Sequence, residues 1–223
     1  MISSSKIVSK VPGTLSKMVV FLHGYGASGD DLIGISAFWQ DLLPPSIFIA
    51  PNGPEACEVN VFGHQWFGLP DFSPTNIRLG LDRIRPVLLN YLQSLLNEYQ
   101  LSPQDLALVG FSQGTIVALE MMFAMPDLNC ILGYSGAFFK PPFVASPPPS
   151  TKVLLVHGNM DTVVPYWCLF QSQTQLKSLG VESETHTCMG LAHTIDQKGI
   201  EIGGEFLARN LNKNNKGDPH VTP

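Results

Sequence analysis

Charged side chains are scarce in this chain. Only 14% of its 223 residues are Asp, Glu, Lys or Arg, whereas 44% are hydrophobic, and the formal net charge is −5. Intrinsic disorder needs the opposite balance, with low hydrophobicity and high charge. A chain with net negative charge also lacks the basic surface that binds nucleic acid. We therefore expect a folded protein that does not bind nucleic acid.

Long apolar runs and patterned cysteines are missing as well. No apolar run approaches the roughly 20 residues of a membrane-spanning helix, and the start, M-I-S-S-S-K-I-V, lacks the apolar stretch of a signal peptide. The cysteines show neither C-x-x-C nor metal-ligand spacing. We expect reduced thiols and a cytoplasmic location. The four cysteines are Cys57, Cys130, Cys168 and Cys188.

Several well-known functional motifs are absent too. The chain has no G-x-x-x-x-G-K-[ST] loop and no G-x-G-x-x-G after a strand, which argues against the common nucleotide-binding folds. It has no H-E-x-x-H motif and no cluster of Cys and His, so we expect neither a metal nor another cofactor.

What the chain does have is an alternation of short buried strands and amphipathic helices. This alternation predicts an α/β fold, in which one mostly parallel sheet is covered by helices on both faces. We expect a single domain over residues 1–211 and a disordered tail over 212–223, with a proline-rich surface loop near 141–149. The predicted strands are 18–22, 46–50, 105–110, 129–134, 152–157 and 182–187, and the predicted helices are 30–43, 76–99, 113–125, 165–179 and 194–211.

The longest predicted helix, 76–99, carries an apolar stripe at helical spacing. Pro86 lies inside this pattern, so we expect a kink or a break there. The residues expected to form the buried stripe are Leu79, Leu81, Ile84, Val87, Leu88, Leu92, Leu95 and Leu96.

The main candidate for chemistry is Ser112, in the segment G-F-S-Q-G at 110–114. This G-x-S-x-G pattern is short enough to arise by chance, but here it lies between a predicted strand and a predicted helix. At such a junction the two glycines permit a sharp turn that exposes the serine oxygen above the sheet. The position of the motif, more than its letters, predicts a nucleophilic serine.

A serine hydroxyl becomes a nucleophile when a histidine accepts its proton, and a carboxylate orients that histidine. In this kind of hydrolase the chain order is serine, acid, histidine. His193 lies in G-L-A-H-T, a loop between the last strand and the last helix, and is the predicted base. His186 falls on the polar face of that strand, and His220 falls in the tail.

Asp161 is the predicted acid, because it follows strand 152–157 and lies between Ser112 and His193 in the chain. Taken alone, it would be interpreted as an ordinary turn or cap aspartate. Asp196 is its main competitor, but it begins the last helix, where a carboxylate has a structural role.

The tetrahedral intermediate of such a reaction needs backbone N–H donors. We expect one from Gln113, directly after Ser112, and one from the loop H-G-Y-G at 23–26. His23 precedes the serine in the chain and is interpreted as structural. Ser135 lacks an elbow and is interpreted as a turn residue, while His157 is either structural or a neighbour of Asp161.

With these residues placed, the chain resembles the phospholipase/carboxylesterase family of α/β-hydrolases, which includes the acyl-protein thioesterases. The resemblance runs from about Val19 to Leu211. It implies an α/β-hydrolase fold without a large lid domain, and a triad of Ser112, Asp161 and His193. It also implies oxyanion-hole N–H groups from Tyr25 and Gln113. The matching segments, in order, are F-L-H-G-Y-G at 21–26, A-P-N-G-P at 50–54, Q-W-F at 65–67, G-F-S-Q-G at 110–114, H-G-N-M-D-T-V-V-P at 157–165 and G-L-A-H-T at 190–194.

The implied substrate is a small-molecule carboxylic ester with a short acyl chain or of the lysophospholipid type. An acyl-protein thioester is the alternative. A peptidase or a non-catalytic ligand-binding protein with this fold is less favoured, and a homodimer is compatible with the family. The candidate substrate-binding residues are Trp66, Leu69, Phe72, Phe138, Phe139 and Phe143.

Two residues depart from the family pattern. Thr115 follows G-F-S-Q-G where small residues are common, and Asn159 occupies a position that is often acidic. We expect neither change to remove the triad, although Asn159 lowers the negative charge near Asp161.

Overall fold

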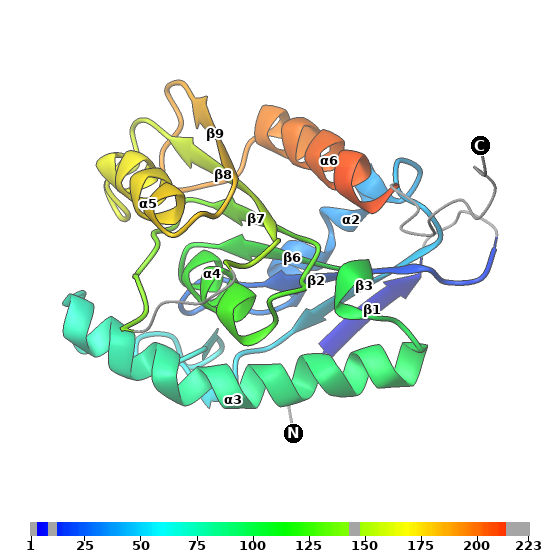
Figure 1. Cartoon of the computed structure of the whole chain (residues 1–223). Coiled ribbons are helices and arrows are strands. Elements are labelled where there is room, and N and C mark those ends of the chain that lie inside the picture. The colour runs from blue at the N-terminus through cyan, green and yellow to red at the C-terminus, as the bar shows by residue number, and fades with distance from the viewer. Residues whose placement is uncertain (1–3, 9–12, 143–147, 213–223) are drawn as a thin grey trace.

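The computed structural model describes residues 4–8, 13–142 and 148–212, and its centre is a seven-stranded sheet (Figure 1). The strands are β1 (Ser4–Val8), β2 (Lys17–Leu22), β3 (Ser46–Pro51), β6 (Leu106–Phe111), β7 (Cys130–Tyr134), β8 (Lys152–Gly158) and β9 (Ser183–Cys188). Their order in the sheet is β1-β3-β2-β6-β7-β8-β9. The six neighbouring strands β3, β2, β6, β7, β8 and β9 run parallel, and β1 pairs antiparallel with β3 at one edge.

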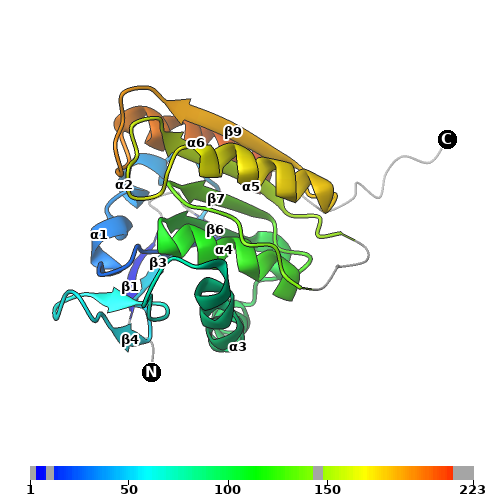
Figure 2. The ribbon, with the colours of Figure 1, turned by 90° about the vertical axis from the view of Figure 1, so that its left-hand side faces the viewer.

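Helices cover both faces of this sheet, as the alternating pattern predicts. They are α1 (Asp30–Ile33), α2 (Ser36–Trp39), α3 (Pro74–Tyr99), α4 (Gln113–Ala124), α5 (Trp167–Ser178) and α6 (Gln197–Leu211). Helices α3, α4 and α5 pack on one face, and α1, α2 and α6 on the other (Figures 1 and 2). Along β2, Met18 and Val20 join the first core while Val19 and Phe21 join the second, because neighbouring strand residues point to opposite faces. The predicted α/β-hydrolase fold is confirmed.

Helix α3 differs in two ways from its prediction. It is continuous from Pro74 to Tyr99, so of the kink or break expected at Pro86, the break does not occur. Pro86 lies on the exposed face, and the helix is anchored by buried side chains on both sides of it. Leu79 and Val87 are exposed at 51% and 43%, and they do not belong to the buried stripe. Ile77, which was not expected in the stripe, is buried.

Three further segments differ from the sequence-based expectation. The predicted helix 30–43 is two short helices, α1 and α2, separated by Gly34 and Ile35. Between β3 and α3, where no strand or helix is predicted, lies a small hairpin of β4 (Glu55–Ala56) and β5 (His64–Gln65). Strand β1 was not predicted, because five residues of mixed polarity give a weak period. The predicted disordered tail from 213 onward, and residues 143–147 of the proline-rich loop, lie outside the described residues.

The functional residues predicted from the sequence follow the carboxyl ends of the parallel strands. In a sheet of this type, ligands bind where those ends meet their loops. Ser112 follows β6, Asp161 follows β8, His193 follows β9, and Tyr25 follows β2. Within the described ranges, no helix is long and apolar enough to cross a membrane. No insertion of lid size interrupts the described parts of the fold.

Candidate active site

Ser112 occupies the sharp turn between β6 and α4. Its φ of 54° and ψ of −116° lie outside the regions that ordinary residues adopt. Packing enforces this strained backbone. A Cβ on Gly114 would lie 1.8 Å from the Leu22 carbonyl oxygen, and a Cβ on Gly110 would lie 2.5 Å from the Thr115 Cα. The two glycines of the motif are therefore required by close backbone approach.

Thr115, the first departure from the family pattern, fits into space that two other glycines leave open. Its hydroxyl donates to the Tyr134 carbonyl oxygen at 2.8 Å, so the buried oxygen is satisfied. A Cβ on Gly133 or Gly136 would lie within 2.5 Å of the Thr115 side chain. The extra side chain is thus accommodated without disturbing Ser112.

Asp161 and His193 form a close pair. His193 Nδ1 lies 2.7 Å from Asp161 Oδ2, and the Asp161 side chain is fully buried. The other carboxylate oxygen, Oδ1, accepts the N–H groups of Val163 and Val164 at 2.9 Å each. Burial alone would raise the pKa of Asp161. The hydrogen bonds from His193, Val164 and Val163 outweigh burial and hold this pKa below its usual value. Asp161 is therefore ionised at neutral pH and aimed at His193.

A second histidine also faces Asp161. His157 Nε2 lies 2.9 Å from the Val164 carbonyl oxygen and 3.3 Å from Asp161 Oδ2. The ring is 2% exposed, and burial lowers its pKa despite the nearby carboxylate. A carbonyl oxygen only accepts hydrogen bonds, so Nε2 carries the proton of a neutral ring. His157 thus connects β8 to the loop that carries Asp161 and Val164.

His193 and Ser112 line the same pocket, and Phe111 lies next to both of them. The Phe111 and His193 rings have centroids 4.9 Å apart, and Phe111 directly precedes Ser112. Ser112 Oγ makes no hydrogen bond within the part of the chain that the structure describes. Catalytic hydrogen bonds commonly tighten only when substrate binds, so this geometry is compatible with the predicted roles.

The loop after β2 supplies the second side of the pocket near Ser112. Gly24 and Tyr25 line the pocket beside Ser112 and Gln113. The Gln113 N–H lies in the first turn of α4 and has no intrahelical acceptor. His23 holds this loop. Its Nε2 accepts the Gly53 N–H at 2.8 Å, so the proton is on Nδ1, which donates to the Gly24 carbonyl. Burial lowers the His23 pKa, which fits a structural role.

The Gln113 side chain was not assigned a role from the sequence. It is 2% exposed, its Oε1 accepts the Trp66 N–H at 3.0 Å, and its Nε2 donates to the Phe67 carbonyl at 2.8 Å. These bonds tie the start of α4 to the segment that precedes Leu69. A buried Gln directly after the nucleophile is the signal that could have indicated this role.

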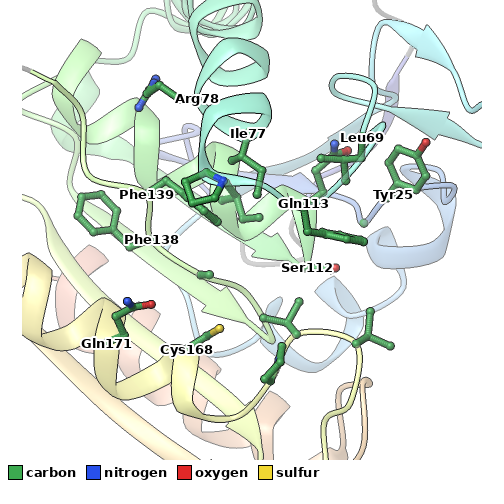
Figure 3. A pocket seen from close by; sticks show the side chains of 18 of the residues that line it. Tyr25, Leu69, Ile77, Arg78, Ser112, Gln113, Phe138, Phe139, Cys168 and Gln171 are labelled. Atoms are coloured by element: carbon green, nitrogen blue, oxygen red, sulfur yellow. The ribbon is translucent and has the colours of Figure 1, made fainter.

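The pocket that contains Ser112 has a volume of about 1160 Å³ and extends between α3 and α5 (Figure 3). Four predicted substrate-binding residues line it: Leu69, Phe72, Phe138 and Phe139. Trp66 does not line it. That prediction is corrected, because Trp66 is 1% exposed and its indole N–H donates to the His23 carbonyl. Phe143 lies outside the described residues. Lining residues that the sequence analysis missed include Ile77, Arg78, Ile116, Val163, Trp167, Cys168, Gln171 and Gln175.

The missed residues of α3 and α5 come from segments whose sequence indicates only a structural role. Ile77 and Arg78 lie within the first five residues of the long helix α3, and Cys168 and Gln171 lie in the first half of α5. Neither segment carries a motif. Their roles depend on how the two helices approach each other, which the sequence period does not reveal.

The competing residues have other partners. Asp196 is the N-cap of α6, and its side chain accepts the Gly199 N–H at 2.7 Å. His186 is partly exposed on β9 and does not line the pocket. Ser135 is buried with a φ of 46° and its N–H donates to the Val156 carbonyl. His220 lies outside the described residues.

Asn159, the second departure, links two loops of the site. Its Oδ1 accepts the Gly190 N–H at 2.6 Å, and its N–H donates to the Cys188 carbonyl. The loop that carries Asp161 is thereby attached to the loop that carries His193. Among the described residues, no group of three or more His, Cys, Asp or Glu side chains is placed to hold a metal ion.

Comparison with known proteins agrees with this geometry. Residues 4–211 match the model of a family described as phospholipase/carboxylesterase. The crystal structure of esterase PE8 superposes with a TM-score of 0.87 at 36% identity, covering 94% of this chain and 99% of that one.

Two curated proteins are more distant relatives. The chain is 25% identical to esterase YpfH of Escherichia coli over 198 residues, which is 88% of this chain and 84% of YpfH. It is 26% identical to acyl-protein thioesterase 1 homolog 1 of Dictyostelium discoideum over 224 residues, which is 95% and 98% of the two chains. With the elbow, the pocket and these relatives in agreement, the chain belongs to the phospholipase/carboxylesterase family of α/β-hydrolases.

Proposed function

We propose that this protein, an ester hydrolase by its family, is a serine carboxylesterase in which Ser112 is the nucleophile, His193 the base and Asp161 the acid. The single observation that carries the proposal is the Asp161–His193 pair beside Ser112. A buried, ionised carboxylate is bonded at 2.7 Å to a histidine that shares the pocket with a serine on a strained elbow. A structural aspartate would not need a partly exposed histidine at the mouth of an apolar pocket.

The hydrogen bonds determine which atoms of the triad carry a proton and which can accept one. Asp161 accepts from His193 Nδ1, so the other ring nitrogen, Nε2, is free to accept a proton from Ser112 Oγ. As Oγ attacks the acyl carbonyl, His193 becomes positively charged, and Asp161 stabilises that charge. His193 then donates the proton to the leaving group, at the oxygen of the alcohol for an ester or at the sulfur of the thiol for a thioester. A water molecule attacks the acyl-enzyme by the same route, and Ser112 regains its proton.

The negative charge on the carbonyl oxygen is stabilised by two backbone N–H groups in this proposal. Gln113 supplies one at the start of α4, where the helix dipole adds to the effect. Tyr25 supplies the other from the loop that His23 holds in place. Removal of one such donor typically costs about 10²- to 10³-fold in kcat.

The pocket supports an acyl group as the part of the substrate that enters it. Leu69, Ile77, Ile116 and Phe139 contribute apolar side chains to the pocket that contains Ser112. We propose a carboxylic ester of the short-acyl or lysophospholipid type as substrate. The name of the Dictyostelium relative favours an acyl-protein thioester as the second candidate. The peptidase and the non-catalytic protein stay less favoured. The homodimer and the cytoplasmic location stay predictions.

The test is labelling with a fluorophosphonate together with hydrolysis of p-nitrophenyl butyrate. We expect Ser112→Ala to abolish labelling and to lower kcat by about 10⁴-fold or more. The matched control is Ser135→Ala, a second serine at a strand end, which should be labelled normally. Full labelling or turnover in Ser112→Ala would exclude Ser112 as the nucleophile. A panel of ester, thioester and peptide substrates separates the candidate activities.

A further inference from the structure

The pocket has two chemically different ends. Ser112 and Tyr25 lie at one end, whereas Arg78, Phe138, Phe139 and Gln171 lie on the side away from Ser112 (Figure 3). Apolar side chains such as Ile77 lie between the two ends. The far end is therefore separated from the reacting serine by an apolar stretch, although it belongs to the same cavity.

The charge of the pocket is unusual for this chain. The protein has 18 acidic and 13 basic residues, yet none of the described residues that line the pocket is Asp or Glu, and two, Arg78 and Lys140, are cationic. Residues 143–147, which neighbour this end in sequence, carry no ionisable side chain. The sign of the charge inside the pocket is thus opposite to that of the whole protein.

The positive charge of Arg78 is neutralised by acidic partners. Its guanidinium binds Glu120 Oε1 at 2.7 Å, Glu120 Oε2 at 2.8 Å and Asp82 Oδ1 at 3.1 Å. Arg85 binds the same two carboxylates. Two arginines and two acids balance one another, so this cluster fixes the α3–α4 wall and contributes no net charge.

Lys140 is the cation that remains. It directly follows Phe139, its side chain is exposed, and it forms no ion pair or hydrogen bond within the described ranges. Gln171, also exposed, has no hydrogen-bond partner among the described residues either. Gln175 Oε1 and Arg78 Nε are buried with no partner there. The far end therefore holds one unpaired positive charge among polar groups whose hydrogen-bonding capacity the protein does not use.

We propose, as an extension of the serine-esterase function above, that this far end binds a negatively charged group on the distal end of the acyl chain. The matching substrate class is the half-ester of a linear dicarboxylic acid. Its ester carbonyl reacts at Ser112, its methylene chain lies against Ile77 and Phe138, and its free carboxylate binds at Lys140 and Gln171. The carboxylate is a spectator, so the chemistry at Ser112 is unchanged.

The test compares two matched series of substrates on the whole protein. One series is the monoethyl esters of linear dicarboxylic acids from succinic to azelaic acid, and the other is the ethyl esters of the monocarboxylic acids of equal chain length. The quantity measured is the ratio of kcat/KM for the charged ester to that for its neutral partner. We expect this ratio to exceed one and to reach a maximum at one chain length, where the carboxylate reaches Lys140.

Lys140→Met removes the charge and keeps the length of the side chain. We expect it to lower the maximal ratio by about 1.5-fold to fivefold, the effect of one exposed charge pair. Added salt should lower the wild-type ratio as well. Lys177→Met, which removes a lysine of α5 that does not line the pocket, is the control and should leave the ratio unchanged.

A ratio below one at every length, or the same ratio in wild type and Lys140→Met, overturns the inference while the esterase function stands. Absence of both hydrolysis and fluorophosphonate labelling means instead that the proposed function has failed. Lysophosphatidic acid is tested as a further substrate, because its negative charge lies on the alcohol side of the ester and not on the acyl side. If Lys140→Met weakens turnover of that lipid alone, the anionic group belongs to the alcohol, and the acyl-side placement is wrong.

Discussion

The two sides of the candidate triad are held in place by different forces. On the nucleophile side, Ser112 is fixed by backbone contacts, since Gly110 and Gly114 leave no room for other arrangements. On the base side, His193 lies in a loop and is held by a hydrogen bond to Asp161 and by the Phe111 ring. The position of the nucleophile is thus part of the core, whereas the position of the base depends on a few protonatable groups.

This contrast teaches which changes should affect activity alone and which should affect the whole fold. Steric contacts between backbone atoms are shared with the stability of the protein. Hydrogen bonds to a partly exposed imidazole can be lost while the sheet and its helices stay folded. Three changes separate the two sides, and they follow in order of expected effect.

Asp161→Asn acts on the base side and should give the largest effect on activity. The amide still accepts the N–H groups of Val163 and Val164 through Oδ1, so the loop keeps its shape. It no longer presents a carboxylate to His193, which then adopts the wrong tautomer. We expect kcat to fall by about 10³- to 10⁴-fold with little change in the melting temperature, measured by circular dichroism.

Asp196→Asn is the matched control for that change. It removes a carboxylate of the same region but keeps an N-cap of equal quality on α6. Its kcat should stay close to that of the wild type. A similar loss of kcat in both variants would mean that local charge, and not the bond to His193, is responsible.

Gly114→Ala acts on the nucleophile side and should affect folding. Its Cβ would meet the Leu22 carbonyl oxygen at 1.8 Å, so β2 and α4 cannot keep their present distance. We expect a loss of about 3 kcal/mol or more in the free energy of unfolding, measured with urea. Gly34→Ala is the control, since nothing lies within 4 Å of its added Cβ. Equal stability of the two variants would show that the elbow is not constrained by packing.

The smallest of the three effects concerns the pH dependence of stability. Burial lowers the pKa of His157 and of His23 from 6.5, so the unfolded chain binds more protons than the folded one below that pH. Stability is fully present above about pH 6.5 and falls as the pH drops below it, by at most about 1.4 kcal/mol per histidine for each pH unit. Asp161 adds to this loss only near its unfolded value of 3.8.

His157→Gln sharpens this last measurement. It should reduce the slope of unfolding free energy against pH between pH 6.5 and pH 5, because one of the two buried histidines is gone. His186→Gln removes a partly exposed histidine of β9 and serves as the control. An unchanged slope in His157→Gln would mean that this ring is protonated without cost in the folded state.

The same contrast explains what the sequence could predict. The six parallel strands of the sheet are predictable because buried strands produce short apolar runs that turns interrupt. The elbow and the order of Ser112, Asp161 and His193 are local or sequential features, and these were visible too. Leu79 and Val87 were assigned to the buried stripe of α3 because periodicity cannot tell the buried edge of a helix from its exposed edge.

Features that depend on three-dimensional packing were not predictable in this way. The continuous helix through Pro86 depends on the buried side chains on either side of it, which outweigh the missing hydrogen bond. Trp66 was expected in the pocket because aromatic residues often line such sites, but its indole N–H reaches the His23 carbonyl instead. Arg78 and Gln171 become neighbours of the site only because α3 and α5 face each other across it.

Thr115 has a consequence for how the family can diverge. Its side chain fills the space over Gly133 and Gly136, and its hydroxyl binds the backbone of β7. Alanine at position 115 would remove the Thr115 Cγ2, which would lie 2.5 Å from a Cβ on Gly133, but it would keep the Cβ that would lie 2.3 Å from a Cβ on Gly136. The size of residue 115 therefore limits what position 133 can carry, whereas position 136 is restricted to glycine as long as residue 115 has any side chain.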